Sequence, residues 1–179
     1  RASSGGKKYG ATWWSGGRDL RPGVEQDAVY KEFKRDEPLD SEHNKKLISK
    51  MPKLFASPNL PDELAKKGMA SYVAPIGEKT IWDGNKGNII SNITDGTSNT
   101  LAILEADTEH AVIWTKPDDL TIDWKAPKNG LELWKSGANS IFITAFCDGS
   151  VRAISDKVDP ALMKKLLQMN DGEVIGEIP

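Results

Sequence analysis

The chain contains only two histidines, the side chains best suited to acid–base chemistry near neutral pH. His43 lies beside Asn44 and two lysines on the predicted water-facing side of a helix, and His110 follows Glu109 at a predicted strand edge. A Ser-His-Asp triad needs a histidine base that its neighbours orient. Neither histidine has a local context of that kind, so we interpret both as surface histidines.

Residues 96–100 come close to the G-x-S-x-G pattern of a nucleophilic serine, with Ser98 in the nucleophile position. The segment lacks the second glycine, and it precedes a predicted strand, whereas the nucleophile elbow follows a strand and opens a helix. We therefore predict a polar turn whose side chains bond their own backbone. Cys147 lies in a predicted strand, where we expect a small buried hydrophobic side chain rather than a reactive thiol.

Residues 83–88, with the sequence DGNKGN, resemble the start of a calcium-binding EF-hand loop. That loop requires glycine at its sixth position and glutamate at its twelfth, but the chain has Asn88 and Thr94 there. The mismatch excludes an EF-hand. A looser calcium site with oxygen ligands among the turn aspartates is kept as an alternative to ordinary solvated turns, and the metal ligands are left unassigned.

Three aspartates, Asp118, Asp119 and Asp123, lie between Trp114 and Trp124. A glycosidase places paired carboxylates along its cleft, so a hydrolase built on Asp118, Asp119 and a neighbouring histidine is a further hypothesis. Nothing else in the sequence selects it over a simple turn. The sequence also has no P-loop, dinucleotide fingerprint, H-E-x-x-H pair or cysteine-based metal spacing. We therefore assign no catalytic residue and no cofactor, and we predict that the chain is not an enzyme.

The composition fits one ordinary folded domain. The 179 residues carry 24 basic and 26 acidic side chains, and 38% of them are hydrophobic. A net charge of −2 offers no strong field for nucleic acid, so nucleic-acid binding is not expected. A single cysteine forms no intramolecular disulfide, and no apolar run reaches the roughly 18 residues of a membrane span. Four tryptophans in polar, glycine-rich surroundings are expected to cover loops or meet a partner: Trp13, Trp14, Trp82 and Trp134.

Helical signals come first along the chain, and strand signals follow. Residues 72–74, 100–105 and 111–114 read as strands, with a hairpin joining the last two. Three short helices are predicted before them: over residues 26–33, from a cap at Asp40 or Ser41 to Met51, and after Pro61 with an end at Gly68.

The clearest signal lies near the C-terminus. Two strand-like runs, residues 140–147 and 150–154, flank Asp148-Gly149. Asp-Gly between two strands predicts a hairpin with a type I′ turn, which needs positive φ at both central residues. A helix capped by Asp159 follows, with a stripe of leucine and methionine. The whole pattern indicates an α+β fold, an antiparallel sheet with helices packed on it.

Several stretches, spanning about residues 24–176, match a known family in the same order: 25–26 with Tyr30 and Phe33, 36–48, 51–53, 93–100, 114–120, 148–152 and 172–176. The chain thereby resembles the large prepilin-like family of Planctomycetes and their relatives. Members typically carry an N-terminal type IV pilin-like helix and a C-terminal globular domain of unknown function. Their signature is a histidine some ten residues before an Asp-Gly pair. The chain lacks the pilin helix, and Ala138 stands roughly in the place of the signature histidine.

The resemblance implies a pilin-like or pseudopilin-like globular head, exported to the surface or exterior of a bacterial cell. We expect a non-catalytic globular domain over residues 24–176, an N-terminal arm over residues 1–23 and a C-terminal tail over residues 177–179. Its partners would be further copies or other proteins of a surface assembly, and membrane contact would come only from an N-terminal helix or another domain missing from this chain. A calcium- or glycan-binding surface module is the alternative, and a hydrolase is the less favoured one.

Overall fold

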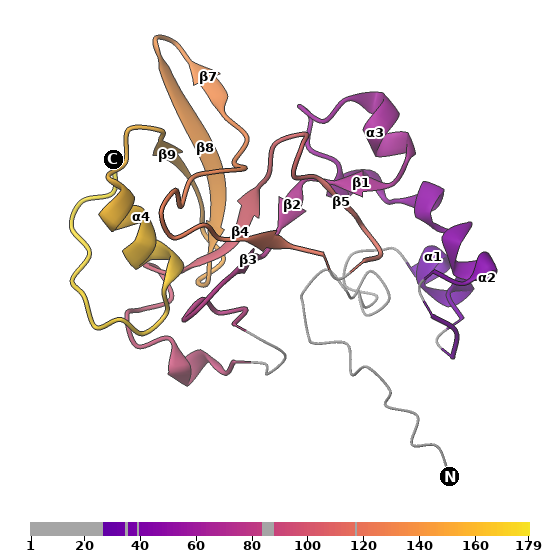
Figure 1. Ribbon diagram of the computed structural model, residues 1–179, viewed down its shortest axis with the longest axis horizontal. Helices are drawn as coiled ribbons and strands as arrows, with labels where there is room; N and C mark the ends of the chain where they lie inside the picture. The colour runs from indigo at the N-terminus through magenta and orange to yellow at the C-terminus, as the bar shows by residue number, and fades with distance from the viewer. Residues whose placement is uncertain (1–26, 35, 39, 84–87, 117) are drawn as a thin grey trace.

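The computed structural model describes residues 27–34, 36–38, 40–83, 88–116 and 118–179 (Figure 1). The architecture is mixed, with antiparallel sheets and few helices, which agrees with the α+β class in general form. The helices are α1 (Asp27–Glu32), α2 (Glu42–Lys45), α3 (Asp62–Lys66) and α4 (Pro160–Leu167), with 3-10 turns η2 (Ile48–Lys50), η3 (Lys53–Phe55) and η4 (Ile90–Asn92). The strands are β1 (Met69–Ala70), β2 (Tyr72–Val73), β3 (Pro75–Ile76), β4 (Leu101–Glu105), β5 (Val112–Ile113), β6 (Leu120–Thr121), β7 (Trp134–Ser136), β8 (Asn139–Phe146) and β9 (Val151–Ser155).

A five-stranded antiparallel sheet organises the molecule, with the order β2-β4-β8-β7 and with β9 also paired to β8. Thr144 of β8 pairs with β4 and with β9, and Ile141 pairs with β7 and with β9. Strands β4 and β7 therefore follow one another along one edge of β8, while β9 covers the other edge. The hairpin of β7 and β8 projects beyond the rest of the sheet (Figure 1).

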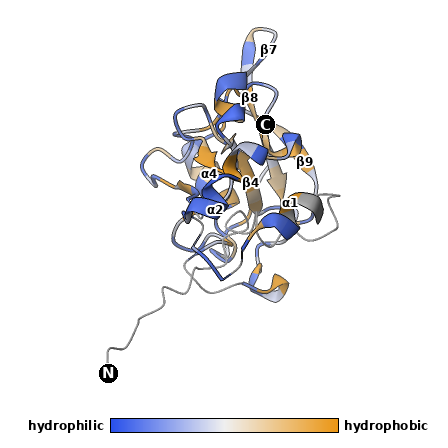
Figure 2. Cartoon of the chain, turned by 90° about the vertical axis from the view of Figure 1, so that its right-hand side faces the viewer, coloured by the Kyte–Doolittle hydropathy of each residue, from blue (hydrophilic) through white to orange (hydrophobic). Residues whose placement is uncertain are grey.

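The main hydrophobic core lies between this sheet and α4. Burial alternates along β8, as expected for a strand with one face in the core, and this places Phe142 and Phe146 inside. Helix α4 is capped by Asp159, whose side chain accepts a hydrogen bond from the Ala161 backbone N–H, and the helix buries Leu166 against the sheet. Figure 2 shows the central strand β4 as hydrophobic, with hydrophilic segments around it. The predicted capped C-terminal helix is confirmed.

A second hydrophobic cluster surrounds Trp114, apart from the main core. The Trp114 ring stacks on Phe55 and meets Phe33 edge-on, with ring centroids 5.8 Å apart in both pairs. Its indole N–H donates to the Ile48 carbonyl at 2.9 Å. Phe33, directly after α1, and Leu47, shortly after α2, belong to this cluster. The segments around α1 and α2 thus pack on a buried tryptophan. We predicted several helices on the antiparallel sheet, but among the described helices it is α4 that packs on the main sheet.

The predicted hairpin between residues 100–105 and 111–114 is wrong. Strand β4 is flanked by β2 and β8, so both of its edges are taken. After β4 the chain turns at Asp107, and β5 pairs with β1 instead. A parallel pair of two-residue strands, β3 with β6, was not predicted. Such short strands carry no periodicity that a sequence reader could detect.

The predicted β8–β9 hairpin is present, but its turn is not type I′. Gly149 has φ +84°, whereas Asp148 does not have positive φ. The Gly149 N–H donates to the Phe146 carbonyl at 3.0 Å, and the Phe146 N–H donates to the Ser150 carbonyl at 2.9 Å. This is a three-residue loop, a turn followed by a left-handed glycine that forms a bulge. Cys147 is the first loop residue, so the tight turn begins one residue earlier than predicted.

The second predicted helix is shorter than expected. Ser41 is its cap, accepting from the Asn44 backbone N–H, but α2 ends at Lys45 and continues only as the 3-10 turn η2. Met51 precedes a proline, which disfavours the helical conformation, and it adopts φ −52° and ψ 126°. The third helix ends near Gly68 as predicted. Gly68 has φ +73°, and a Cβ there would lie 2.3 Å from the Ile48 carbonyl oxygen.

Of the two ends of the chain, the structure describes the C-terminal one. The predicted arm over residues 1–23, including Trp13 and Trp14, lies outside the described residues. At the C-terminus, Ile178 packs against the main core, and the Ser155 N–H donates to the Pro179 carbonyl at 3.0 Å. Within the described part of the chain, no helix is both long enough and apolar enough to cross a membrane.

Candidate functional site

Both histidines form local polar contacts. The His43 Nε2 lies 2.8 Å from the Glu32 carbonyl oxygen and can donate to it, so it joins α2 to the end of α1. The His110 Nδ1 lies 2.7 Å from Asp107 Oδ1, in the turn after β4 rather than at a strand edge. A Cβ on Gly130 would lie 2.9 Å from the His110 ring, so the imidazole covers that glycine. Each histidine is half-buried, and whereas His43 joins two helices, the His110 bond stays within one turn.

The near-nucleophile segment at residues 96–100 bonds its own backbone, as predicted. The Asn99 side-chain amide donates to the Asp95 carbonyl at 3.0 Å, and the Thr100 hydroxyl donates to the Gly96 carbonyl at 3.1 Å. Ser98 is exposed. Cys147 is half-buried rather than fully buried, and burial together with Asp148 raises the pKa of its thiol to about 11. At neutral pH this thiol is protonated and therefore a poor nucleophile.

The candidate carboxylate clusters come apart into separate turns. Among the described residues, no group of three His, Cys, Asp or Glu side chains is placed to hold a metal ion. Asp83 accepts from the Lys79 N–H at 3.2 Å, and Asp123 accepts from the Lys125 N–H at 2.9 Å. Residues 84–87 of the possible calcium loop lie outside the described residues, and Asp118 and Thr94 are exposed.

The tryptophans that could form a binding platform are occupied within the fold. Trp114 is 2% exposed in the second cluster. Trp124 packs on the main core and closely covers Gly77, where a Cβ would lie 2.9 Å from its ring. The indole N–H groups of Trp82 and Trp134 donate to the Ala102 carbonyl and to Glu105, respectively. Both indole groups thus bond to β4, and contact of Trp82 or Trp134 with a partner stays a prediction.

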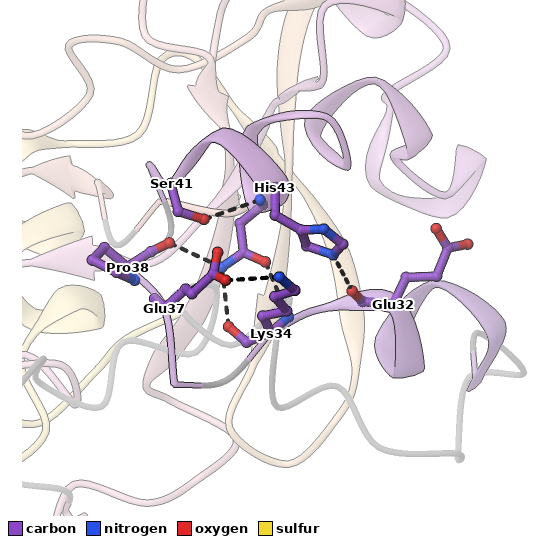
Figure 3. Close-up of polar contacts among 7 residues, drawn as sticks. Glu32, Lys34, Glu37, Pro38, Ser41 and His43 are labelled. Atoms are coloured by element: carbon purple, nitrogen blue, oxygen red, sulfur yellow. Dashed lines mark hydrogen bonds and ion pairs between the residues drawn. The ribbon is translucent and has the colours of Figure 1, made fainter.

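Figure 3 shows the polar contacts between α2 and the loop that precedes it. Asn44 lies in α2, within the matched stretch 36–48, and its side chain bonds the backbone of that loop. The side chain is fully buried. Its Oδ1 accepts from the Lys34 N–H at 3.1 Å, and its Nδ2 donates to the Lys34 and Pro38 carbonyls at 3.0 and 2.9 Å. A weaker contact reaches the Glu37 carbonyl at 3.4 Å. Asn44 therefore substitutes for the backbone partners that this irregular loop lacks.

Three of the matched stretches, 93–100, 148–152 and 172–176, converge with the loop after α4. The Asp95 carboxylate accepts from the Asp171 N–H at 2.7 Å and from the Gly172 N–H at 3.1 Å. The Thr97 carbonyl accepts from the Asp148 N–H at 3.1 Å. The Thr100 carbonyl accepts from the Cys147 N–H at 2.9 Å. We call this group of bonds around residues 95–100 the junction. Its polar groups fix backbone geometry.

A buried carboxylate, Glu105, ties together three parts of the chain. It is 2% exposed at the end of β4. The Ser57 hydroxyl, from the connection before α3, donates to its Oε1. The Trp134 indole N–H, from β7, donates to its Oε2 at 2.9 Å. Burial and the Glu105 charge raise the pKa of the neighbouring Tyr72 hydroxyl. Because buried carboxylates need partners, these two donors are what makes the position tolerable.

A shallow surface hollow lies beside Ser57, the residue that donates to Glu105, and it is too narrow to hold a water molecule. Its lining comes from the connection before α3, the link between β1 and β2, and the segments after β4 and before β7: Ser57, Asn59, Leu60, Ser71, Ala106, Thr108 and Glu132. The Ser71 hydroxyl is buried and has no hydrogen-bond partner. Burial, with help from Glu105 and Asp107, raises the pKa of Glu132 at the rim.

Asp119 is the one member of the predicted acidic cluster that is substantially buried. Its Oδ1 accepts from the Ala74 N–H at 3.0 Å, beside the β3–β6 pair. Its Oδ2 is buried without a partner. Burial raises the pKa of Asp119 to about 6, and the Asp118 charge adds to this rise. Burial is the main cause of this rise in pKa. The neighbouring Asp118 is exposed, so the two carboxylates do not face a common cleft.

Sequence reasoning did not find Asn44, Glu105 or the hollow. For Glu105 the sequence gives no signal, because glutamate is rarely buried unless it is paired. The partners that make its burial possible, Ser57 and Trp134, lie 48 and 29 residues away in the sequence. Comparison of the chain with family models, curated proteins and solved structures finds no match.

Proposed function

We propose that the chain is the non-catalytic globular domain of an exported pilin-like or pseudopilin-like protein that works in a surface or extracellular assembly. The observation that carries the proposal is the junction. Asp95 is the ionisable residue of the stretch 93–100, and both of its carboxylate oxygens accept hydrogen bonds from backbone N–H groups. A residue used in this way supports a scaffold rather than a reaction. The antiparallel sheet with its packed C-terminal helix is compatible with a pilin-like head.

A pair of substitutions within one stretch tests the structural role of the junction. Asp95→Asn should lower the free energy of unfolding by about 1–3 kcal/mol, because hydrogen bonds to a charged acceptor are lost. Ser98→Ala, at an exposed position three residues on, should change it by less than about 0.5 kcal/mol. Urea unfolding measures both. Equal stability of the two variants would contradict the scaffold reading. So would a hydrolytic activity, found in a substrate screen, that Ser98→Ala abolishes.

The assembly itself is tested with the gene product that carries this chain. Cell fractionation and surface labelling should place it outside the cytoplasm, and sedimentation velocity should show association that grows with concentration. Asp95→Asn serves as the matched variant, because a destabilised head should reduce the assembled fraction. A monomer that stays in the cytoplasm would refute the proposal.

The alternative functions are separate arms of the same study. Titration calorimetry with calcium and with a panel of surface glycans would detect a binding module. A saturable heat that Asp83→Asn removes would favour calcium at the 83–88 loop. Heat from a glycan that survives this substitution would favour a glycan module. Either result would replace the structural proposal with a binding function.

A further inference from the structure

We propose that the side of the main sheet opposite α4 is the surface through which two copies of this chain meet, face to face about a two-fold axis. Six side chains of β4, β8 and β9 form this surface, which we call the open face: Ile103, Ile141, Ile143, Ala145, Val151 and Ala153. The inference rests on the proposed assembly role and deepens it, because it names where the copies touch.

The strand register places these six side chains together. Burial alternates along β8, so its positions 141, 143 and 145 point away from the core that holds Phe142. In β9, Ile154 pairs with Phe142 and shares its side, so positions 151 and 153 point the other way. The cross-strand pairs on the open face are Ile143 with Ala153, Ala145 with Val151, and Ala145 with Ile103.

The open face is apolar where the solvated side of a sheet is usually polar. An antiparallel sheet with one side in the core and one in water typically alternates apolar and polar residues. Here the outward positions of β8 and β9 are apolar too, and Val151 is 67% exposed. Among the described residues, neither hydrophobic cluster includes any of the six side chains. An apolar patch of this kind is typical of a contact surface.

The lack of charge on the open face favours an identical copy as its occupant. In a two-fold contact each surface meets itself, so a charged side chain would come close to its own like charge. None of the six residues is ionisable. Arg152, between two of them, turns to the core side, where its guanidinium carbon lies 4.3 Å from the Phe146 ring centroid. Its Nη2 lies 3.7 Å from Asp148 Oδ2 there. The arrangement keeps the charge of β9 away from the open face.

Edge-to-edge pairing through β9 is the other way in which two copies could meet, and it is less favourable. The Ser155 N–H on that edge already donates to the Pro179 carbonyl at 3.0 Å, which shortens the free edge. Antiparallel pairing that uses the outward groups of both Val151 and Ala153 would set Arg152 directly opposite its own copy. Like charges in that position destabilise a sheet, and charged edge residues commonly protect against such pairing. Face-to-face packing avoids this repulsion.

The size of the open face predicts a weak contact. A standard interface uses roughly 20–30 residues on each side, far more than the side chains of the open face. Its rim carries the neutral polar residues Asn139 and Ser155, and an apolar centre with a polar rim is the usual anatomy of an interface. Two sheets packed in this way lie about 10 Å apart. The contact should therefore form at the high local concentration of a repeated assembly and dissociate on dilution.

Sedimentation velocity of the full chain over a concentration series tests the contact, and NMR backbone amide shifts over the same series locate it. The average mass should rise with concentration, and the amides that move should be those of the open face. Val151→Glu should weaken association at least about tenfold, because both meeting surfaces then bury an unpaired charge. Its thermal midpoint should stay close to that of the wild type, because Val151 is already largely exposed.

The matched control is Val174→Glu, the same change at a side chain that is 86% exposed and lies outside the open face. It should associate as the wild type does. A further arm tests the two-fold symmetry. A mixture of Val151→Glu and Val151→Lys should associate more strongly than either variant alone, because opposite charges then meet across the contact. If the open face met a different surface of the next copy, mixing would restore nothing, and the two-fold arrangement would be wrong.

Three further results would overturn the proposal. Equal association of Val151→Glu and Val174→Glu would mean that the copies meet elsewhere, while the proposed assembly would stand. A chain that stays monomeric at NMR concentrations would remove the contact, even if the gene product assembles through other parts. Open-face amide shifts that differ in the monomeric gene product and ignore concentration would mean that another of its segments covers the face. A gene product retained in the cytoplasm would refute the proposed function, and sedimentation would still decide this contact.

Discussion

Asp119 offers a sharp test of the electrostatics of this fold. Its Oδ1 accepts a hydrogen bond from the Ala74 N–H, while its Oδ2 is buried without a partner. Burial raises the pKa from 3.8 to about 6. The folded chain thus holds this proton more tightly than the unfolded chain does. The contribution of Asp119 to the free energy of unfolding therefore falls as the pH rises from 3.8 to about 6, and it stays lower above that range.

The magnitude follows from the size of the pKa change. One pKa unit corresponds to about 1.4 kcal/mol, so a rise of about two units sets an upper limit of about 3 kcal/mol. Asp119 keeps some contact with water, and this screening reduces the expected effect to about 1–2 kcal/mol. Asp119→Asn keeps an oxygen for the Ala74 N–H and removes the charge. We therefore expect Asp119→Asn to be more stable than the wild type by about 1–2 kcal/mol at pH 7.5, and by much less near pH 4.

Urea unfolding at pH 4, 5, 6 and 7.5 measures this difference for the wild type and for Asp119→Asn. Subtracting the two curves cancels the carboxylates that they share, provided these do not couple to Asp119. Asp118→Asn is the control, because it removes an exposed neighbouring charge and should change stability by less than about 0.5 kcal/mol. A stability difference that does not depend on pH would refute the reasoning. Lower stability of Asp119→Asn at pH 7.5 would refute it as well.

Further expected outcomes concern the packing and the loops. Asn44→Ala should lower the free energy of unfolding, measured in urea, by about 2–4 kcal/mol, because several backbone groups lose their partner. Ser41→Ala removes only the helix cap and should lower it by about 1 kcal/mol. Equal losses in the two variants would contradict the central role of Asn44. Leu166→Ala should cost about 2–5 kcal/mol in the same assay, whereas Val174→Ala, at a side chain that is 86% exposed, should be nearly neutral. Gly149→Ala should lower stability by about 1–2 kcal/mol by thermal and urea unfolding through φ alone, because no atom lies within 4 Å of the added Cβ; no change would refute the left-handed loop.

The elements that were predicted well depend on neighbours in the sequence. The hairpin of β8 and β9 follows from an apolar alternating run and an Asp-Gly pair. Helix α4 follows from Asp159, the proline after it and a stripe of leucines. The type I′ assignment failed because Asp-Gly serves equally well in the three-residue loop, where only Gly149 needs positive φ. The dipeptide is local, but the choice between the two loops depends on how the strands meet.

The candidate chemistry was harder to predict because a side chain's role depends on distant partners. The polar turn at residues 96–100 was predicted correctly, since its bonds reach only a few residues. The pairing of β5 with β1 was not, because both edges of β4 were already taken by strands elsewhere in the chain. Asp119 was noticed as one of a cluster, yet its partner, the Ala74 N–H, is 45 residues away.

The sequence by itself determined the α+β class, the C-terminal hairpin with its following helix, and the polar character of the turns. These depend on side-chain alternation, caps and glycine, whose effects act over a few residues. Only the tertiary structure decided that the early helical segments pack around Trp114 and that the Ser71 hydroxyl is buried without a partner. It also decided that Glu105 accepts hydrogen bonds from Ser57 and Trp134. Burial and hydrogen bonding depend on which segments meet in space, and for these residues the partners lie tens of residues apart.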